Sequence, residues 1–360
     1  MLPLVSVIIP VYNTQNYLRR CLDSLKKQTF KNWEALCIND SSTDCSWEIL
    51  QEYAAGDTRI RIYNQANAGP GAARQNGLNH AKGKYIMFLD SDDWYDEDML
   101  SEMIAAMENH DIDLACCQTE VEDEKGLTCR TADELRFYYN KQSGLLLFNA
   151  KSRLETNGII WNKIYKKDII DRFNISFATT FEGEDTIFSY CYKCMSRNIF
   201  FIDKKLYHYF RNQKSLMSQM KCQKNQRLDN QIHNTEHLLS FLRKNDFLAK
   251  DINTHLELIR GNITFCFSHL DKHLWPEIIR PLAAVLRQYG ITEQKMPQLT
   301  VDNRQWLHTV SVCNTDYLIT ITKRIKVGRL TLFKIKTKTQ QIKFYFLGIP
   351  IWHRKNKMLL

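Results

Sequence analysis

Hydrophobic residues along the first 117 positions alternate between two kinds of pattern. Val5 to Val11 is a continuous β-rich run, VSVIIPV, as expected of a strand buried on both faces. Apolar residues then recur three and four positions apart, which predicts one face of a helix: Leu18, Cys21, Leu22 and Leu25. The same alternation predicts strands at 34–39, 59–63, 84–89 and 112–116, and helices from about 43, at 69–80 and at 96–109. Such short intervals predict an α/β fold with a mostly parallel sheet covered by helices on both faces.

The rest of the chain follows other patterns. Residues 118–218 are less regular and rich in aromatic side chains, and from about 222 to 290 the apolar spacing becomes helical. We therefore expect one domain over 1–220, with halves 1–117 and 118–220, a C-terminal helical region over 221–316 and a tail over 317–360.

The net charge of +9 is concentrated in that tail. Residues 317–360 hold eleven lysines and arginines and no acidic residue, so the remainder of the chain is close to neutral. A nucleic-acid-binding protein would carry its basic residues on the binding domain. We therefore expect no nucleic-acid partner.

The cysteines and the apolar runs suggest a compartment. Eleven cysteines are scattered through the chain, and Cys191 and Cys194 form a lone CxxC without the further ligands of a zinc site. No apolar run reaches the roughly 18–20 residues that cross a bilayer. The apolar start lacks a basic leader, so it predicts a buried strand rather than a signal peptide. Reduced thiols and a cytoplasmic location are expected.

The sharpest local signal is a run of carboxylates after the apolar strand that ends at Leu89. Asp90, Asp92 and Asp93 lie within four residues, and such crowding is unfavourable unless a cation or hydrogen-bond donors compensate it. Ligands with oxygen atoms alone suit Mg²⁺ or Mn²⁺. The alternative is an acidic turn that caps the helix at 96–109.

Two more segments follow strands of the same sheet. Asp40, at the end of the second strand, could accept hydrogen bonds from a nucleotide base or cap the next helix, although Thr43 or Asp44 could also be that cap. The segment from 67 to 74 has a Gly-x-Gly but no third glycine, which argues against a dinucleotide fingerprint. Its glycines would let the backbone approach a donor, and Arg74 could meet a phosphate or pack as structure.

Together, residues 6–13, 39–44, 67–83 and 89–94 resemble the family 2 glycosyltransferases of the GT-A fold. The resemblance covers about the first 115 residues and implies a domain with a Rossmann-like sheet. The first half of that domain, residues 1–117, would bind a nucleotide-diphosphate sugar. It places the base near Tyr12 and Asp40, and Mn²⁺ or Mg²⁺ on Asp90 and Asp92. The same motifs add further donor-binding candidates: Pro10, Asn13, Arg74 and Ser91. The family's D-D-G-S-T-D reads N-D-S-S-T-D here, with Asp40 retained.

The half over 118–220 would bind the acceptor. Residues 181–188 resemble the family's G-E-D motif, which makes Asp185 the expected general base and Glu184 the second candidate. The alternative is that one of these acidic residues caps a helix. Trp161 is expected as a platform for the acceptor or sugar, and His208 or Arg211 near the diphosphate.

These expectations make the chain an inverting, metal-dependent glycosyltransferase, with a UDP-sugar favoured as donor. The acceptor would be a glycan or a polyprenyl-diphosphate-linked glycan, as in surface polysaccharide biosynthesis. The basic tail over 323–357, which includes Phe344, Phe346 and Trp352, is expected either to dock peripherally on the inner face of the membrane or to form paired strands. The alternative functions are a sugar nucleotidyltransferase and a non-catalytic carbohydrate-binding protein.

Overall fold

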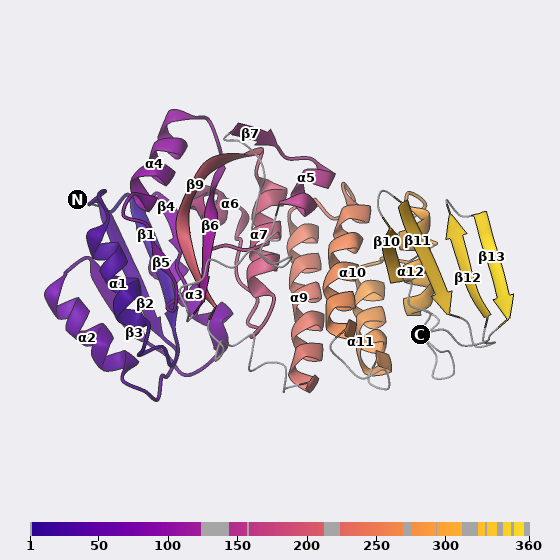
Figure 1. The fold of residues 1–360 in the computed structure, drawn as a ribbon, viewed down its shortest axis with the longest axis horizontal. Helices are drawn as coiled ribbons and strands as arrows, with labels where there is room; N and C mark the ends of the chain where they lie inside the picture. Colours follow the sequence, from indigo (N-terminus) through magenta and orange to yellow (C-terminus); the bar gives the residue numbers. More distant parts are fainter. Residues whose placement is uncertain are drawn as a thin grey trace. The chain divides into compact units, whose positions relative to one another are not determined.

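The chain forms two compact units, Met1–Leu270 and Asp271–Leu360 (Figure 1). This computed structural model describes residues 2–123, 144–156, 158–211, 224–268, 275–292, 294–311, 323–327, 330–336, 341–346 and 349–355. The boundaries expected near 220 and 316 lie outside these residues. Each unit is described by itself below.

The first unit is built on a nine-stranded sheet with the order β3-β2-β1-β4-β8-β6-β9-β5, and β7 pairs with β9. The strands are β1 (Val5–Val11), β2 (Trp33–Asn39), β3 (Ile60–Asn64), β4 (Tyr85–Phe88), β5 (Trp94–Tyr95), β6 (Leu114–Asp123), β7 (Gly144–Leu147), β8 (Lys163–Lys166) and β9 (Asn198–Arg211). The helices are α1 (Leu18–Lys27), α2 (Ser46–Gly56), α3 (Gly69–His80), α4 (Met99–Asn109), α5 (Ala150–Glu155), α6 (Lys167–Phe173), α7 (Glu184–Met195), α9 (Lys224–Lys244) and α10 (Ile252–Ser268).

The parallel sheet predicted from the sequence is confirmed for β3, β2, β1 and β4, and the other half is mixed. β8 lies antiparallel between β4 and β6, while β9 runs parallel to β6 and antiparallel to β5. The sequence did not reveal β8 because it is only four residues long. The expected strand at 112–116 is longer, Leu114–Asp123, and is not the neighbour of β4.

Helices cover both faces of the parallel half. Val5, Val7 and Ile9 of β1 belong to one core with apolar residues of α1, α2 and α4. Ile8 points to the other face, where α3 approaches so closely that a Cβ on Gly77 would lie 2.4 Å from Ile8 Cγ2. A glycine is required there because a larger residue would separate α3 from the sheet.

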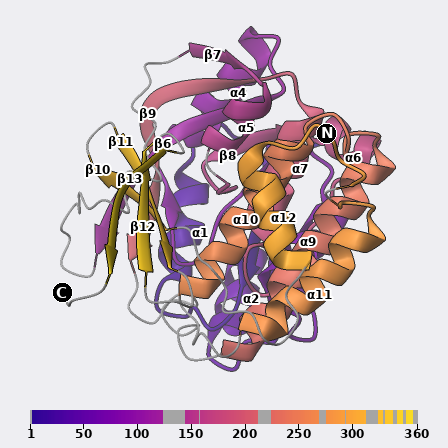
Figure 2. The same ribbon diagram turned by 90° about the vertical axis from the view of Figure 1, so that its right-hand side faces the viewer.

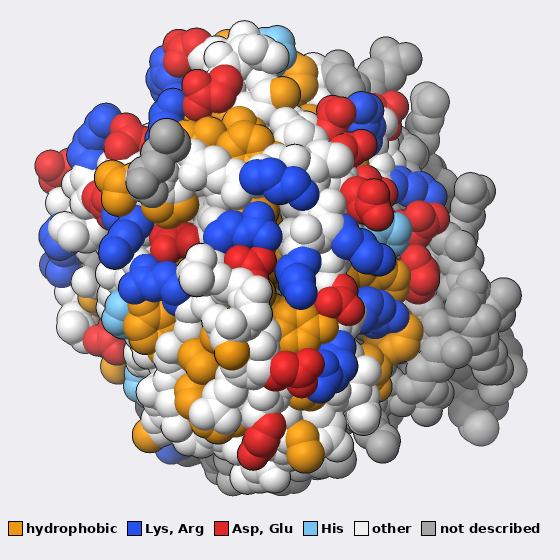
Figure 3. All heavy atoms as spheres, turned by 90° about the vertical axis from the view of Figure 1, so that its left-hand side faces the viewer, with side chains coloured by type: hydrophobic (Ala, Val, Ile, Leu, Met, Phe, Trp, Pro, Cys, Tyr) orange, Lys and Arg blue, Asp and Glu red, His pale blue; other side chains and the backbone are white. Residues whose placement is uncertain are grey.

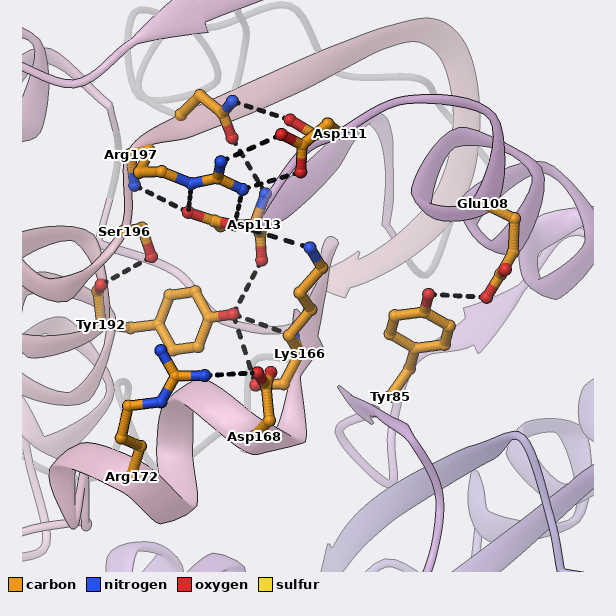
Figure 4. Close-up of polar contacts among 11 residues, drawn as sticks. Tyr85, Glu108, Asp111, Asp113, Lys166, Asp168, Arg172, Tyr192, Ser196 and Arg197 are labelled. Atoms are coloured by element: carbon orange, nitrogen blue, oxygen red, sulfur yellow. Dashed lines mark hydrogen bonds and ion pairs between the residues drawn. The ribbon is translucent and has the colours of Figure 1, made fainter.

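A polar network fixes β8, the strand inserted between β4 and β6 (Figure 4). It lies at the end of β6 and β8 that is opposite the loop of Asp90, Asp92 and Asp93, which is called the acidic loop below. The Tyr192 hydroxyl accepts a hydrogen bond from the Lys166 N–H at 2.8 Å and donates to the Asp113 carbonyl at 2.7 Å. Arg197 donates to both carboxylate oxygens of Asp113 and also contacts Asp111. Although burial opposes the ionised form, these bonds from Arg197 lower the pKa of Asp113.

Charged side chains of both signs are mixed over the face of the molecule that Figure 3 turns to the viewer. Basic and acidic groups are interspersed there, with hydrophobic side chains between them.

The second unit contains α11 (Trp275–Gln288), α12 (Val301–Ser311) and four strands: β10 (Lys323–Val327), β11 (Leu330–Lys336), β12 (Gln341–Phe346) and β13 (Ile349–Lys355). The strands form one antiparallel sheet in chain order (Figure 1). Figure 2 shows the same four strands grouped together. The backbone therefore agrees with the paired strands expected as one alternative for the tail. The structure does not describe the side chains of Phe344, Phe346 and Trp352, and membrane docking by the tail stays a proposal. Among the helices described, none has the length and apolar character that crossing a bilayer requires.

Candidate active site

The expected donor residues lie along one rim of the sheet, where β1, β2 and β4 end side by side. Pro10 lies near the end of β1, and Tyr12, just beyond it, is 41% exposed, so its ring is accessible to a ligand. Asn13 adopts a left-handed conformation with φ +52°, and its Oδ1 accepts a hydrogen bond from the Thr43 N–H at 2.7 Å. Asn13 thereby joins the loops that follow β1 and β2.

Asp40 is buried and anchors the start of α3. Its Oδ1 accepts hydrogen bonds from Gln65 Nε2 and the Ala68 N–H, and its Oδ2 accepts one from the Gly69 N–H, each at 2.9 Å. At the start of α2, the helix that follows Asp40 in the sequence, the Asp44 carboxylate accepts a hydrogen bond from the Ser46 N–H. Asp40 therefore supports the third helix, and its expected contact with a base remains a proposal.

The glycines that begin α3 lie in close contact with residues 178–181. A Cβ on Gly71 would lie 2.4 Å from the Ala178 carbonyl oxygen, and one on Gly69 would lie 2.8 Å from the Phe181 ring. The space beside these glycines is thus filled by the chain itself. These glycines let α3 pack on the segment that leads into α7, and their expected role beside a donor stays a prediction.

Arg74 joins the donor motif to the acceptor motif. It is 7% exposed, and its Nη2 donates to Asp90 Oδ1 at 2.7 Å while its Nη1 donates to Glu184 Oε1 at 2.6 Å. These carboxylates raise the pKa of Arg74 although its burial acts in the opposite direction. Of the two roles expected for Arg74, the structure shows the structural one, and it holds the motifs together across 110 residues of sequence.

The acidic loop after β4 holds carboxylates in different environments. Asp90 and Asp92 are partly exposed, whereas Ser91 and Asp93 are buried. Burial and the charge of Asp90 raise the pKa of Asp92 to about 6. No side chain of the described residues forms a hydrogen bond with the Asp92 carboxylate, which leaves its oxygens available as ligands.

Asp93 is a structural residue. Its Oδ2 accepts a hydrogen bond from the Tyr207 hydroxyl at 2.6 Å, and its Oδ1 accepts one from the Phe210 N–H at 2.8 Å. Burial and the charges of Asp92 and Asp90 raise its pKa well above the usual value. This contact fixes the acidic loop to β9. Sequence reasoning gave Asp93 no partner because the two residues that bind it lie more than a hundred positions away.

The two candidate bases begin α7. Glu184 is buried against Arg74, and burial raises its pKa while the guanidinium opposes that rise. Asp185 is less buried, and its Oδ1 accepts a hydrogen bond from the Thr186 N–H at 2.6 Å. Burial likewise raises the pKa of Asp185, and the charges of Arg74 and Asp90 both act on it. The structure thus brings Asp185 into the same site as the acidic loop.

The other acceptor-side candidates fare differently. Trp161 is only 4% exposed and stacks on Tyr207 with ring centroids 4.2 Å apart, so it belongs to the core and presents no open face to a sugar. The expected role of Trp161 as a platform for the acceptor or sugar stays a prediction. Arg211 ends β9 opposite Asp123, and its expected place near the diphosphate stays a prediction.

His208 lies on β9 next to two glutamates. Its Nδ1 is 3.2 Å from Glu122 Oε1, and its ring stacks on Trp94 with centroids 5.1 Å apart. Glu120, Glu122 and His208 could together offer three ligand atoms to a metal. Lys205 already forms an ion pair with Glu120 at 3.1 Å, so one of the two carboxylates has a cationic partner within the protein.

Comparison with known proteins decides the family. The model for glycosyl transferase family 2 matches residues 6–173. The chain is 30% identical over 228 residues to glycosyltransferase GlyG of Streptococcus pneumoniae, covering 60% of this chain and 74% of GlyG. The chain belongs to glycosyltransferase family 2. It is also 36% identical over 211 residues to the putative glycosyltransferase EpsH of Bacillus subtilis. That match covers 58% of this chain and only 60% of the length of EpsH.

The fold is the GT-A fold expected for family 2. The structure of Staphylococcus aureus TarS, residues 1–349 in complex with UDP, superimposes with a TM-score of 0.63 at 20% identity, covering 97% of this chain and 100% of that one. In this family 2 member Arg74 joins Asp90 of the loop after β4 to Glu184 of the segment that resembles the G-E-D motif.

Proposed function

We propose that the chain transfers a sugar from a UDP-sugar to a glycan or polyprenyl-diphosphate-linked acceptor, with inversion, in surface polysaccharide biosynthesis. The observation that carries this proposal is the bridge from Asp90 through Arg74 to Glu184. Transfer requires a donor and an acceptor in one site, and this bridge places the acidic donor loop beside the first turn of α7. Family membership supports the same reaction class.

Asp90 and Asp92 are the residues we propose to hold Mg²⁺ or Mn²⁺. Their ligand atoms are oxygens alone, as these hard cations prefer, and only one oxygen of Asp90 is bound by Arg74. Burial and repulsion from Asp90 raise the pKa of Asp92, and a bound cation would relieve that repulsion. Bound there, the ion would stabilise the negative charge that develops on the departing nucleoside diphosphate.

Asp185 is the proposed general base. It would accept the proton of the acceptor hydroxyl as that oxygen attacks the anomeric carbon, and a single in-line displacement inverts the configuration. Its position in the first turn of α7 favours a carboxylate, since helix N-termini stabilise negative charge. Glu184 is less suited to this role because its Oε1 is already bound to Arg74.

The residues of the rim are proposed to bind the nucleotide. Tyr12 would stack against the base, and Asp40 would contact its N–H while supporting α3. Pro10, Asn13 and Ser91 would shape the donor pocket around them. The TarS structure was solved with UDP, and a second TarS structure with UDP-GlcNAc, which supports testing these compounds first.

The proposal is tested by single-turnover transfer with Asp92→Ala and Asp185→Asn. Loss of the base is expected to slow transfer by about 10²–10⁴-fold. Loss of Asp92 should reduce transfer by a similar order and raise the Mn²⁺ requirement. Asp168→Asn, at an exposed aspartate on α6, is the control. Near-normal transfer by both site variants would reject the assignments.

Two other outcomes of the same assays would favour the alternatives. Release of pyrophosphate from a nucleoside triphosphate would favour a nucleotidyltransferase. Sugar binding without donor turnover would favour a non-catalytic protein. A thermal-shift screen of nucleotide sugars with and without Mn²⁺ finds the donor, because a ligand at about 100 times its dissociation constant stabilises by about 2.7 kcal/mol.

We also propose that the basic segment 323–357 docks on an anionic membrane at the cytoplasmic face. Its many lysines and arginines support this, since each one near an anionic leaflet contributes about 1 kcal/mol. Cosedimentation with phosphatidylglycerol vesicles measures it. Full-length protein should sediment at low salt, and replacement of the basic residues of β10 by glutamine should weaken this. Equal sedimentation of both proteins would contradict it.

A further inference from the structure

Arg20 of α1 lies between two aromatic rings beside the acidic loop. Its guanidinium carbon is 3.7 Å from the ring centroid of Trp94 and 4.4 Å from that of Phe210. Trp94 belongs to β5, directly after the acidic loop, and Phe210 lies near the end of β9. One side chain of α1 therefore contacts two separate strands, β5 and β9, and its planar shape matches the ring faces.

The same guanidinium holds the backbone of the acidic loop. Arg20 Nη2 donates a hydrogen bond to the Asp92 carbonyl oxygen at 3.1 Å. The next residue, Asp93, is held by the Phe210 N–H. Consecutive residues of the loop are thus attached to α1 and to β9, and Phe210 takes part in both attachments.

The position of Arg20 is unfavourable for the helix alone. Arg20 lies in the first turn of α1, where the helix dipole disfavours a cation and where no acidic residue is present. Burial lowers the pKa of Arg20, and the charges of Asp93, Glu122 and Asp92 act in the opposite direction by attracting the guanidinium. Its Nε is buried without a hydrogen-bond partner among the described residues, so the guanidinium is positioned largely by its contacts with the two aromatic rings.

We infer that Arg20 is a positioning residue that fixes the Asp92 backbone, so that the Asp90 and Asp92 carboxylates meet the cation in one orientation. The inference rests on the proposed function of that pair. Residues that orient metal ligands without touching the metal affect its affinity by about 10–100-fold when they are replaced. Arg20 should therefore act on the concentration of metal that is needed, more than on the rate once metal is bound.

The sharpest test is Arg20→Lys, with Arg19→Lys as the matched control. Lysine keeps the charge but loses the planar group that stacks on both rings. Arg19 is the neighbouring residue on the same helix, and it is exposed and paired with Glu52 at 2.6 Å. Any general effect of an arginine-to-lysine change in α1 appears in both variants.

Mn²⁺ is titrated into each protein at a fixed UDP concentration, and nucleotide binding and donor turnover are both followed. We expect R20K to need about tenfold more Mn²⁺ for half-maximal UDP binding, whereas R19K matches the wild type. At saturating Mn²⁺ the kcat of R20K should return to within about twofold of the wild type. A wild-type Mn²⁺ midpoint in R20K overturns the inference, even if its melting temperature falls.

A second variant covers the possibility that R20K folds poorly. Trp94→Leu leaves Arg20 in place but removes one ring face, and a raised Mn²⁺ midpoint is again expected. An unchanged midpoint in W94L would overturn the stacking part of the inference. Failure of the proposed function looks different, because the wild-type protein would then show no Mn²⁺-dependent UDP binding at all, and the role of Arg20 would fall with it.

Discussion

Arg74 carries one positive charge between two carboxylates that come from distant parts of the sequence. If it is replaced by alanine, Glu184 is left buried without its partner, which costs about 3–5 kcal/mol of folding free energy. Arg74→Ala and Glu184→Ala should therefore destabilise the chain by less together than the sum of their separate effects. Urea unfolding of the two single variants and the double variant measures this coupling. Strictly additive effects would show that the two side chains do not depend on each other.

A buried histidine predicts how the first unit responds to acid. His255 is fully buried, its Nδ1 is 2.9 Å from the Tyr190 hydroxyl, and burial lowers its pKa to about 4. Unfolding returns the pKa to the usual value near 6.5, so the folded state loses stability as the pH falls from about 6.5 to 4. Asp251 and Arg153, the charged groups that act on His255, have opposite effects on its pKa.

The size of this effect follows from the shift. A difference of about 2.5 pKa units corresponds to a loss of roughly 3 kcal/mol of unfolding free energy at pH 4, and this stability is fully present above pH 6.5. His255→Gln should flatten that part of the curve of unfolding free energy against pH. His233→Gln, at an exposed histidine on α9, is the control and should leave it unchanged. An equal slope in both variants would contradict the assignment.

Among the elements, α3 is the one on which the site depends most. Asp40 holds its first turn, Gly69 and Gly71 face the 178–184 segment, and Arg74 projects from it to both acidic motifs. Gly71→Ala should cost about 1–3 kcal/mol, because its Cβ would meet a backbone carbonyl that cannot rotate away. Gly56→Ala, in α2 with open space around it, is the control and should be neutral or slightly stabilising. Thermal unfolding of the two variants distinguishes them.

The elements also show how far the sequence could be interpreted. β1 and α3 were predicted with the bounds the structure has, because an apolar run and a glycine-marked helix start are local signals. β8 was missed because four residues carry too little periodicity, and its place between β4 and β6 depends on contacts distant in sequence. Motif resemblance gave the acidic loop but not Arg20 or Tyr207, which stabilise it from other elements. The burial of Trp161 could not be predicted, because burial of an aromatic residue is a property of the folded chain.

At the scale of the whole molecule, the two units should respond differently to ligand. The proposed donor site lies entirely in residues of the first unit, so donor binding stabilises that unit alone. Calorimetry with UDP and Mn²⁺ should move one unfolding transition upward, by an amount that grows with ligand concentration, and leave the other in place. A single transition that moves as a whole would mean that the units unfold together.

The attachment of Asp93 to Phe210 has a consequence for the order in which the protein matures. The two residues are separated by 117 positions, so a ribosome that adds about 5–20 residues per second exposes the acidic loop some 6–23 seconds before its partner strand leaves the exit tunnel. During that interval the nascent chain holds three crowded aspartates without the β9 groups that fix them. A polypeptide released before β9 has been synthesised would keep every motif of the donor rim and still lack a formed active site.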